Sequence, residues 1–239
     1  IQEQITDFKK TYLDLNKQLE DLLLENLKQK SISPARQKDA EVPNDIVNIL
    51  FDGDAFSGWV KLVFNATKEG IQKIFEKAGG DAIAETNVDV SFNLQNPRAV
   101  QQIEDNALSA TDSYSGTLKD EIKNVLSNGI QNGDSVDTIK DNLKQFFTDK
   151  SDYQAERMAR TESIFAYNQG NLEGYMQSGV VSAKEWLWDN GECTSGECPD
   201  NVADGAIPLD AVFSSGVDSP PSHPNCECSL QPVVGDSED

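Results

Sequence analysis

The sequence lacks several features that define common protein classes. No apolar run approaches the roughly 20 residues that cross a bilayer, so no membrane-spanning helix is expected. With a single histidine, the chain cannot supply the paired histidines of a His-Glu-x-x-His protease, and a zinc-deaminase signature is also absent. After Lys184 there is no lysine or arginine, whereas twelve Asp and Glu residues follow. Because nucleic-acid surfaces need clustered positive charge, direct DNA binding is not predicted.

Acidic residues dominate the remaining composition. The formal net charge is −21 over 239 residues, and 37% of the residues are hydrophobic. So low an apolar content is typical of an elongated helical protein rather than a compact enzyme. The charge is consistent with simple solubility or with an acidic face that meets a basic protein partner.

All four cysteines and the only histidine fall within residues 193–228. Two short motifs contain them, Cys193-Thr-Ser-Gly-Glu-Cys198 and Pro220-Pro-Ser-His-Pro-Asn-Cys-Glu-Cys228. Ligands of this type bind zinc tetrahedrally, and closed sites of this kind are structural rather than catalytic. We therefore predict a structural Zn²⁺ site that uses four of five candidates, Cys193, Cys198, His223, Cys226 and Cys228.

The choice among these five is open from sequence alone. Cys193, Cys198 and Cys226 are the leading ligands, and Cys228 competes with His223 for the fourth place, because neighbouring residues do not easily point at one ion. His223 could instead form a local hydrogen bond. The even number of cysteines also allows two disulfides among Cys193, Cys198, Cys226 and Cys228. No signal peptide is recognisable, so we expect a reducing, cytosolic origin, which favours metal over disulfides.

Residues 1–30 carry the clearest helical pattern. Residues at spacings of three and four form a seam along one face, which predicts packing along another helix or a second copy of the chain. The seam residues are Ile1, Ile5, Phe8, Tyr12, Leu15, Leu19, Leu22 and Asn26. Leu23, Leu24 and Leu27 widen the apolar face, so a helical bundle is equally consistent. The pattern starts without a capping residue, so we expect the helix to continue from a preceding segment.

A polar, proline-containing stretch at residues 31–42 predicts a linker. Residues 43–96 are expected to form a helical region that stops at Gly79-Gly80, followed by a short strand or extended arm. The arm is indicated by alternating apolar residues, Val88, Val90, Phe92 and Leu94.

Residues 97–178 are predicted to form four successive helices. Pro97 suits the first helical position, and the second helix should stop at Asn132-Gly133. Ser135 can cap the third, and the fourth should run from Ser151 or Asp152 to Gly179.

The segment beyond Gly179 is predicted to be a strand followed by loops. The strand should include Trp186. Within the loops, Val212 and Phe213 should form an apolar anchor, and residues 234–239 should form an acidic tail. The expected fold class is thus mainly α with a small α+β C-terminal part, in which a strand and loops are clasped by Cys and His.

The fourth predicted helix carries an unusual polar set, Arg157, Arg160, Thr161, Glu162 and Asn168. Several of these residues share one helix face with apolar neighbours, so burial would require them to be paired with each other or with backbone groups. They could form a solvated face or a buried polar lattice that fixes this helix against the Trp186 strand and the Cys/His segment.

Together, this helix and the cysteine segment resemble a known family. The run Arg157-Met-Ala-Arg160-Thr-Glu162 is similar to the Ala-Arg-Thr-Glu helix of the phage Mu F-like head morphogenesis family, minor head proteins of tailed bacteriophages. That family continues with a strand ending in Trp, a Cys pair, a Phe-containing loop and the ending Pro-Pro-x-His-Pro-Asn-Cys-x-Cys. The resemblance covers about residues 115–233, and we take residues 97–233 as the Mu F-like minor head domain, with 189–233 as the Cys/His clasp.

Two departures from the family pattern stand out. Four residues separate Cys193 from Cys198, where family members often have two. Glu227 stands between the last two cysteines, where the family usually has Arg.

The resemblance implies a structural, non-enzymatic role. Proteins of this family associate with the portal vertex, act in procapsid assembly, and are in some cases proposed to assist DNA packaging or ejection. Portal, capsid and scaffold proteins would be the partners, in the host cytoplasm during assembly and then in the head interior of the virion. Some members are fused to a portal protein, which would suit residues 1–30 as a portal-docking or self-associating helix.

Two other functions remain open. One is a toxin-type or Cys-dependent enzyme, with Cys226 or Cys228 paired with His223 as nucleophile and base. The other is a host-side adaptor or secreted protein held by two disulfides.

Overall fold

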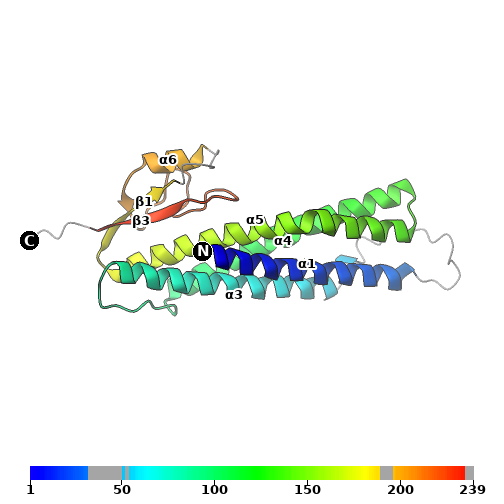
Figure 1. The fold of residues 1–239 in the computed structure, drawn as a ribbon, viewed down its shortest axis with the longest axis horizontal. Coiled ribbons are helices and arrows are strands. Elements are labelled where there is room, and N and C mark those ends of the chain that lie inside the picture. The colour runs from blue at the N-terminus through cyan, green and yellow to red at the C-terminus, as the bar shows by residue number, and fades with distance from the viewer. Residues whose placement is uncertain (32–49, 52–53, 189–195, 235–239) are drawn as a thin grey trace, which may run out of the picture. The chain divides into compact units, whose positions relative to one another are not determined.

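The computed structural model describes residues 1–31, 50–51, 54–188 and 196–234. The long helices are α1 (Gln2–Ser31), α3 (Asp54–Glu85), α4 (Pro97–Asn132) and α5 (Val136–Ser178) (Figure 1). They are followed by β1 (Val181–Leu187), α6 (Glu197–Ala203), β2 (Ile207–Pro208) and β3 (Ser229–Val234). The predicted fold class, mainly helical with a small C-terminal sheet, is confirmed. Among the described helices, none combines the length and the apolar character that crossing a membrane requires.

The chain divides into two compact units, and each long helix contributes to one or both of them. The first unit comprises residues 1–8, 68–107 and 157–239. The second comprises residues 9–67 and 108–156.

An aromatic and polar core organises the second unit. The rings of Tyr12 and Tyr114 meet edge to face with centroids 4.9 Å apart. Buried Asn16 accepts a hydrogen bond of 2.6 Å from the Tyr114 hydroxyl and donates one of 2.9 Å to Ser151 Oγ. Trp59 Nε1 donates to the Leu15 carbonyl at 2.7 Å. Each buried polar atom named here has a partner, as buried polar groups require.

In the first unit, α3 and α5 pack closely because glycines stand at their contact. A Cβ added to Gly170 would lie 2.5 Å from the Phe75 carbonyl oxygen, and one added to Gly174 would lie 2.6 Å from the Gly79 carbonyl oxygen. Side chains at these two positions would force the helix backbones apart. The sequence of α5 thereby sets how near its C-terminal half lies to α3.

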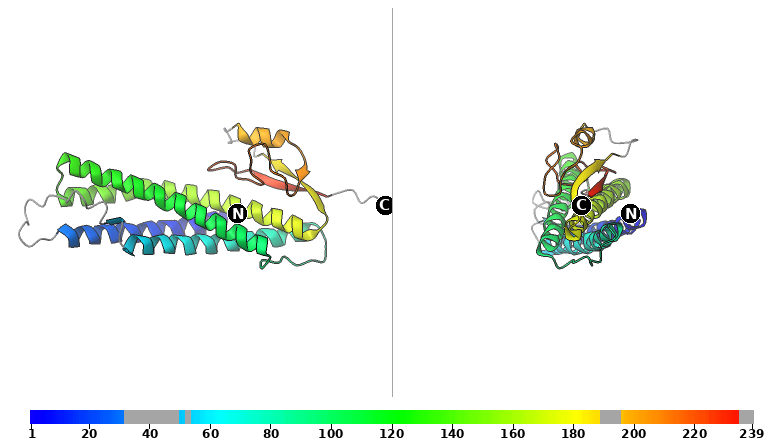
Figure 2. Two further views of the ribbon diagram at one scale, coloured as in Figure 1. Left: turned by 180° about the vertical axis from the view of Figure 1, so that it is seen from behind. Right: turned by 90° about the vertical axis from the view of Figure 1, so that its left-hand side faces the viewer.

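A three-stranded antiparallel sheet in the order β2-β1-β3 follows α5 in the first unit. Gly179, with φ of +70°, ends the helix as predicted and lets the chain turn into β1. Figures 1 and 2 show α6 and the end of α5 on opposite sides of the β1–β3 pair. Trp186 of β1 packs edge to face on buried Phe213, with ring centroids 5.0 Å apart.

Several sequence-based boundaries are wrong. The predicted stop at Gly79-Gly80 lies inside α3, which continues to Glu85. Gly79 instead allows the Phe92 ring to approach the helix backbone, since a Cβ added at Gly79 would lie 2.2 Å from that ring. Of the two alternatives for residues 88–94, a strand or an extended arm, the strand is not formed; Phe92 of this segment packs against Phe75, with ring centroids 6.1 Å apart. Within the loop region, Phe213 is buried as expected, whereas Val212 is exposed.

The four helices predicted for residues 97–178 are two, because α4 and α5 run without the expected breaks. Within the second unit, Ser151 lies where the fourth helix was expected to begin, Tyr114 lies inside α4, and both bond to Asn16. These tertiary contacts outweigh weak local helix propensity. Two predicted starts are confirmed, since α4 starts at Pro97 and the Thr138 N–H donates to Ser135 Oγ at 3.2 Å to cap α5.

The predicted N-terminal helix is observed as α1, with two corrections to its seam. Ile1, predicted as the first seam residue, lies before the helix and is exposed. Leu22 and Asn26 are only half-buried, whereas Leu23 and Leu27 are fully buried, so the seam advances by four residues after Leu19. The predicted linker falls almost wholly outside the described residues, as does most of the acidic tail.

Candidate metal centre

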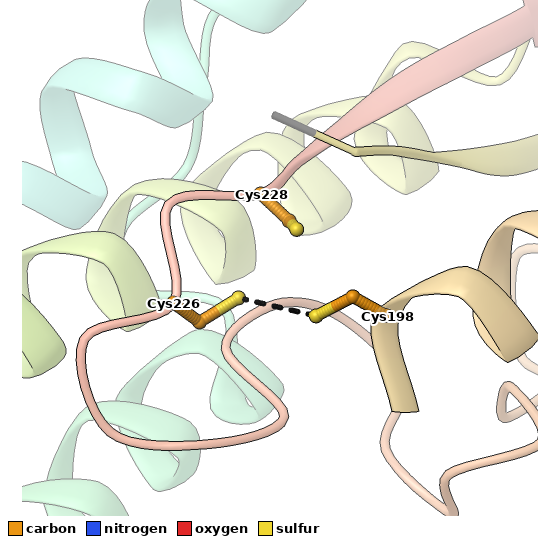
Figure 3. A group of neighbouring side chains, drawn as sticks. All are labelled: Cys198, Cys226 and Cys228. Atoms are coloured by element: carbon orange, nitrogen blue, oxygen red, sulfur yellow. Dashed lines mark hydrogen bonds between the residues drawn. The ribbon is translucent and has the colours of Figure 1, made fainter. Parts of the chain in front are cut away.

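Three of the predicted ligands converge in the first unit. Cys198 lies in the first turn of α6, Cys226 in the loop before β3, and Cys228 immediately before the first residue of β3. Their sulfur atoms lie within 4.8 Å of one another, and all three residues are at most 1% exposed. Figure 3 shows the three side chains pointing into one space. Three buried thiols in this arrangement can hold a metal ion.

The loop geometry explains how residues two apart both point inward. Asn225 has φ of +60°, a conformation that Asn tolerates better than most residues. Its N–H lies 3.4 Å from Thr161 Oγ1 of α5, and the Cys226 N–H donates to the His223 carbonyl at 3.2 Å. This tight turn places Cys226 and Cys228 on the same side of the loop, which sequence reasoning had considered difficult.

His223 also reaches the cluster, through Cys198. Its Nε2 lies 3.3 Å from Cys198 Sγ, and its Nδ1 lies 2.9 Å from the Pro224 carbonyl oxygen. A carbonyl can only accept, so Nδ1 carries the proton, and in the neutral ring Nε2 presents a lone pair to the sulfur. The local hydrogen bond and the approach to the cysteines, weighed as alternatives from sequence, therefore occur together.

The thiols lie within hydrogen-bonding distance of one another. Cys198 and Cys226 lie 3.8 Å apart at sulfur, the contact drawn in Figure 3. The hydrogen bond with the Cys228 thiol and burial raise the pKa of the Cys226 thiol, while backbone amides of Cys228 and Ser222 oppose the rise. Ser222 Oγ lies 3.5 Å from Cys198 Sγ.

None of the three described cysteines forms a disulfide. The separation of 3.8 Å between the Cys198 and Cys226 sulfurs is far longer than the bond of about 2.05 Å in a disulfide. Cys193, the fifth predicted ligand, lies outside the described residues.

Asn168 of α5 holds the cysteine segment in place. It is fully buried, its Nδ2 donates to the Cys228 carbonyl at 3.2 Å, and its Oδ1 accepts the Leu230 N–H at 2.9 Å. One side-chain amide thus satisfies a carbonyl and an N–H at the start of β3, much as a neighbouring strand would. This contact fixes Cys228 against α5.

The other residues of the predicted polar set have different environments. Arg160 forms a salt bridge with Glu227, the residue that stands where the Mu F-like pattern usually has Arg. The Thr161 hydroxyl donates to the Arg157 carbonyl at 2.8 Å. Glu162 is buried and accepts a hydrogen bond of 2.8 Å from Asn106; burial raises its pKa to about 7, and the Asn106 hydrogen bond opposes the rise.

Sequence reasoning missed two buried groups near this site. Gln169 donates from Nε2 to Ser219 Oγ at 2.9 Å, which holds the loop that precedes the cysteines. The fully buried Lys184 donates to the Leu209 carbonyl at 2.9 Å and lies 5.6 Å from the Phe213 ring centroid; burial lowers its pKa to about 8, and Asp218 opposes this. One signal for Lys184 was available, since it is the last cation before a long acidic stretch.

Comparisons with known proteins agree with the resemblance inferred from the residues. The chain is 27% identical over 195 residues to a Bacillus subtilis (strain 168) protein named "Uncharacterized protein YqbB", an alignment that covers 72% of this chain. The chain spans 60% of the length of that relative. No solved structure matches the chain. The sequence model of the family described as "Phage Mu protein F like protein" matches residues 120–231, so the chain carries a Mu F-like domain over these residues, as its helix and its cysteine ending predict.

Proposed function

We propose that the chain is a structural minor head protein of a tailed phage, active in head morphogenesis. The observation that carries this proposal is the Mu F-like domain at residues 120–231. Around this match we assign residues 97–233 to the minor head domain and residues 189–233 to the Cys/His clasp, and we assign no catalytic role to either. The protein acts in the host cytoplasm during assembly and then resides in the virion head.

A position at the portal vertex is the finer part of the proposal. Residues 1–30 were expected to dock on a portal or on a second copy of the chain, and they correspond to α1. The apolar seam of this helix continues through Leu23 and Leu27. The second unit already buries part of this seam, including Tyr12 and Leu15. Docking therefore uses the exposed face of α1 or a segment outside the described residues, and the partners are portal, capsid and scaffold proteins.

The test is genetic and uses a phage that encodes this chain. Removing residues 97–233 should lower the yield of DNA-filled heads, measured by gradient sedimentation and electron microscopy of lysates. A tagged full-length chain should sediment with procapsids and cross-link to the portal protein. A matched control is Asn124→Ala, which alters an exposed residue of α4 and should leave head yield unchanged. Normal yields from the deletion, with the chain absent from particles, would contradict the proposal, and cross-links to capsid protein alone would contradict the portal position.

A Cys-dependent activity is the second candidate, and the 3.3 Å contact between Cys198 and His223 is the observation that favours it. A nucleophile has to reach its substrate, and Cys198 is fully buried. Alkylation by iodoacetamide distinguishes the two functions: rapid reaction at one cysteine without chelator supports the enzyme. Protection of all clustered thiols until a chelator is added supports the structural role.

A further inference from the structure

We infer that Cys198, His223, Cys226 and Cys228 form a closed tetrahedral zinc site, a Cys₃His set that does not require Cys193. The inference concerns only the first unit, and it stands or falls independently of the proposed role in head assembly. It selects four ligands from the five that the sequence offered.

The sulfur positions match the edges of a zinc tetrahedron. A Zn–S distance of about 2.3 Å places two thiolates of a regular tetrahedron about 3.8 Å apart. The Cys198 and Cys226 sulfurs are 3.8 Å apart. The Cys228 sulfur lies within 4.8 Å of both, so a small rotation of its side chain completes the triangular face.

The imidazole lies beside Cys198, where it can supply the fourth ligand. With Zn–N of about 2.0–2.1 Å and Zn–S of about 2.3 Å, a tetrahedral site separates nitrogen from sulfur by about 3.5 Å. His223 Nε2 is 3.3 Å from Cys198 Sγ. The ring contacts the Cys198 sulfur, and closure onto the ion requires the half-buried His223 to shift toward Cys226 and Cys228.

The surroundings of the ring resemble those of metal-bound histidines. Ligating imidazoles usually donate their other N–H to a carbonyl or carboxylate, which fixes the tautomer and aims the free nitrogen at the ion. The Pro224 carbonyl, 2.9 Å from Nδ1, does this for His223. Cys198 has an outer partner too: the Ser222 hydroxyl oxygen lies 3.5 Å from its sulfur and can donate a hydrogen bond to a Cys198 thiolate.

The donor set selects the metal. Thiolates and imidazole favour zinc over hard cations such as Ca²⁺ and Mg²⁺, which prefer oxygen ligands. Three cysteines that are at most 1% exposed leave no fourth position open to water once His223 binds. The site is therefore structural, and it ties α6, the loop before β3 and the first residues of β3 to one point.

The experiment measures zinc in the full chain, purified without chelator, by elemental analysis and by competition with a chromophoric chelator. The wild-type protein and Cys193→Ser should each bind one zinc per chain with equal affinity. Cys226→Ser should lose it. His223→Gln should weaken binding by more than the 10- to 100-fold that loss of an outer-shell partner costs.

Cys193→Ser is the matched control, because it removes a cysteine outside the proposed set. Cobalt substitution of the wild-type and Cys193→Ser proteins provides a readout that does not depend on whether the other variants fold, and both should give the same thiolate-to-cobalt absorption. Loss of zinc in Cys193→Ser with retention in His223→Gln would overturn the inference in favour of a Cys₄ site. A wild-type protein that binds neither zinc nor cobalt would overturn it altogether.

Discussion

Replacing Asn168 with alanine should loosen the cysteine segment from α5. The substitution leaves the Leu230 N–H and the Cys228 carbonyl buried without their side-chain partners. Each buried orphan costs about 1–3 kcal/mol. The third partner, the Ile164 carbonyl, belongs to α5 itself and keeps its helical environment. Alanine also has the better helix propensity, by about half a kcal/mol, so the net loss should be about 2–5 kcal/mol.

Amide hydrogen exchange followed by mass spectrometry measures this loss where it occurs. For peptides that cover residues 226–234, a loss of 2–5 kcal/mol corresponds to exchange that is faster by roughly 30- to 4000-fold, since about 1.4 kcal/mol is tenfold. Asn124→Ala on the exposed face of α4 is the matched control and should stay within about 0.5 kcal/mol of the wild type. Both variants are prepared with the same zinc content. If Asn168→Ala accelerates exchange no more than the control, the argument that this amide anchors β3 is refuted.

Three further perturbations test other parts of the structure. Burial raises the pKa of Glu162 from 4.5 to about 7, so between these pH values the folded chain binds a proton that the unfolded chain releases. The free energy of unfolding should therefore fall by up to roughly 3 kcal/mol as the pH rises from 4.5 to 7. Urea denaturation curves should show this fall in the wild type and not in Glu162→Gln. Gly170→Ala places a Cβ 2.5 Å from the Phe75 carbonyl oxygen and should destabilise the fold by about 1–3 kcal/mol. Gly80→Ala, with nothing within 4 Å of its Cβ, should be neutral or stabilising. Equal effects of the two variants in thermal melts would refute the close approach of α3 and α5. Removing zinc with a chelator should diminish the near-ultraviolet dichroism of Trp186 but leave the far-ultraviolet helical signal largely intact, and loss of both signals together would contradict a local clasp.

Features encoded in short stretches of sequence could be predicted. The helix start at Pro97, the cap at Ser135 and the turn at Gly179 each depend on the backbone preferences of one residue. The approach of Cys226 to a distant Cys198 was predicted from the ligand chemistry, whereas Cys228 was only one of two competitors for the fourth place.

Features that depend on a distant partner could not be predicted. Gly79 has the local signature of a helix stop, and only the neighbouring Phe92 ring shows that the glycine serves close packing inside a continuous helix. The contribution of Gln169 likewise depends on Ser219, fifty positions along the chain. Local periodicity reveals neither partner, because the alternation at residues 88–94 does not show what Phe92 packs against, and Ser219 belongs to a segment without a repeating pattern.

The acidic C-terminal segment forms polar contacts with α5 in addition to the apolar cluster that it shares with Leu172 and Tyr175. No cation follows Lys184, so acidic groups of this segment must be satisfied by residues outside it or by hydrogen-bond donors within it. Arg160 of α5 pairs with Glu227. The Ser214 hydroxyl donates to Asp204, as does the Ser214 N–H at 2.7 Å, and together they lower the pKa of that carboxyl. The departure of Glu227 from the usual family Arg is therefore matched by a cation that the Ala-Arg-Thr-Glu helix already provides. Because the pair is partly exposed, its contribution to stability is modest, and its main consequence is to orient the cysteine loop on α5.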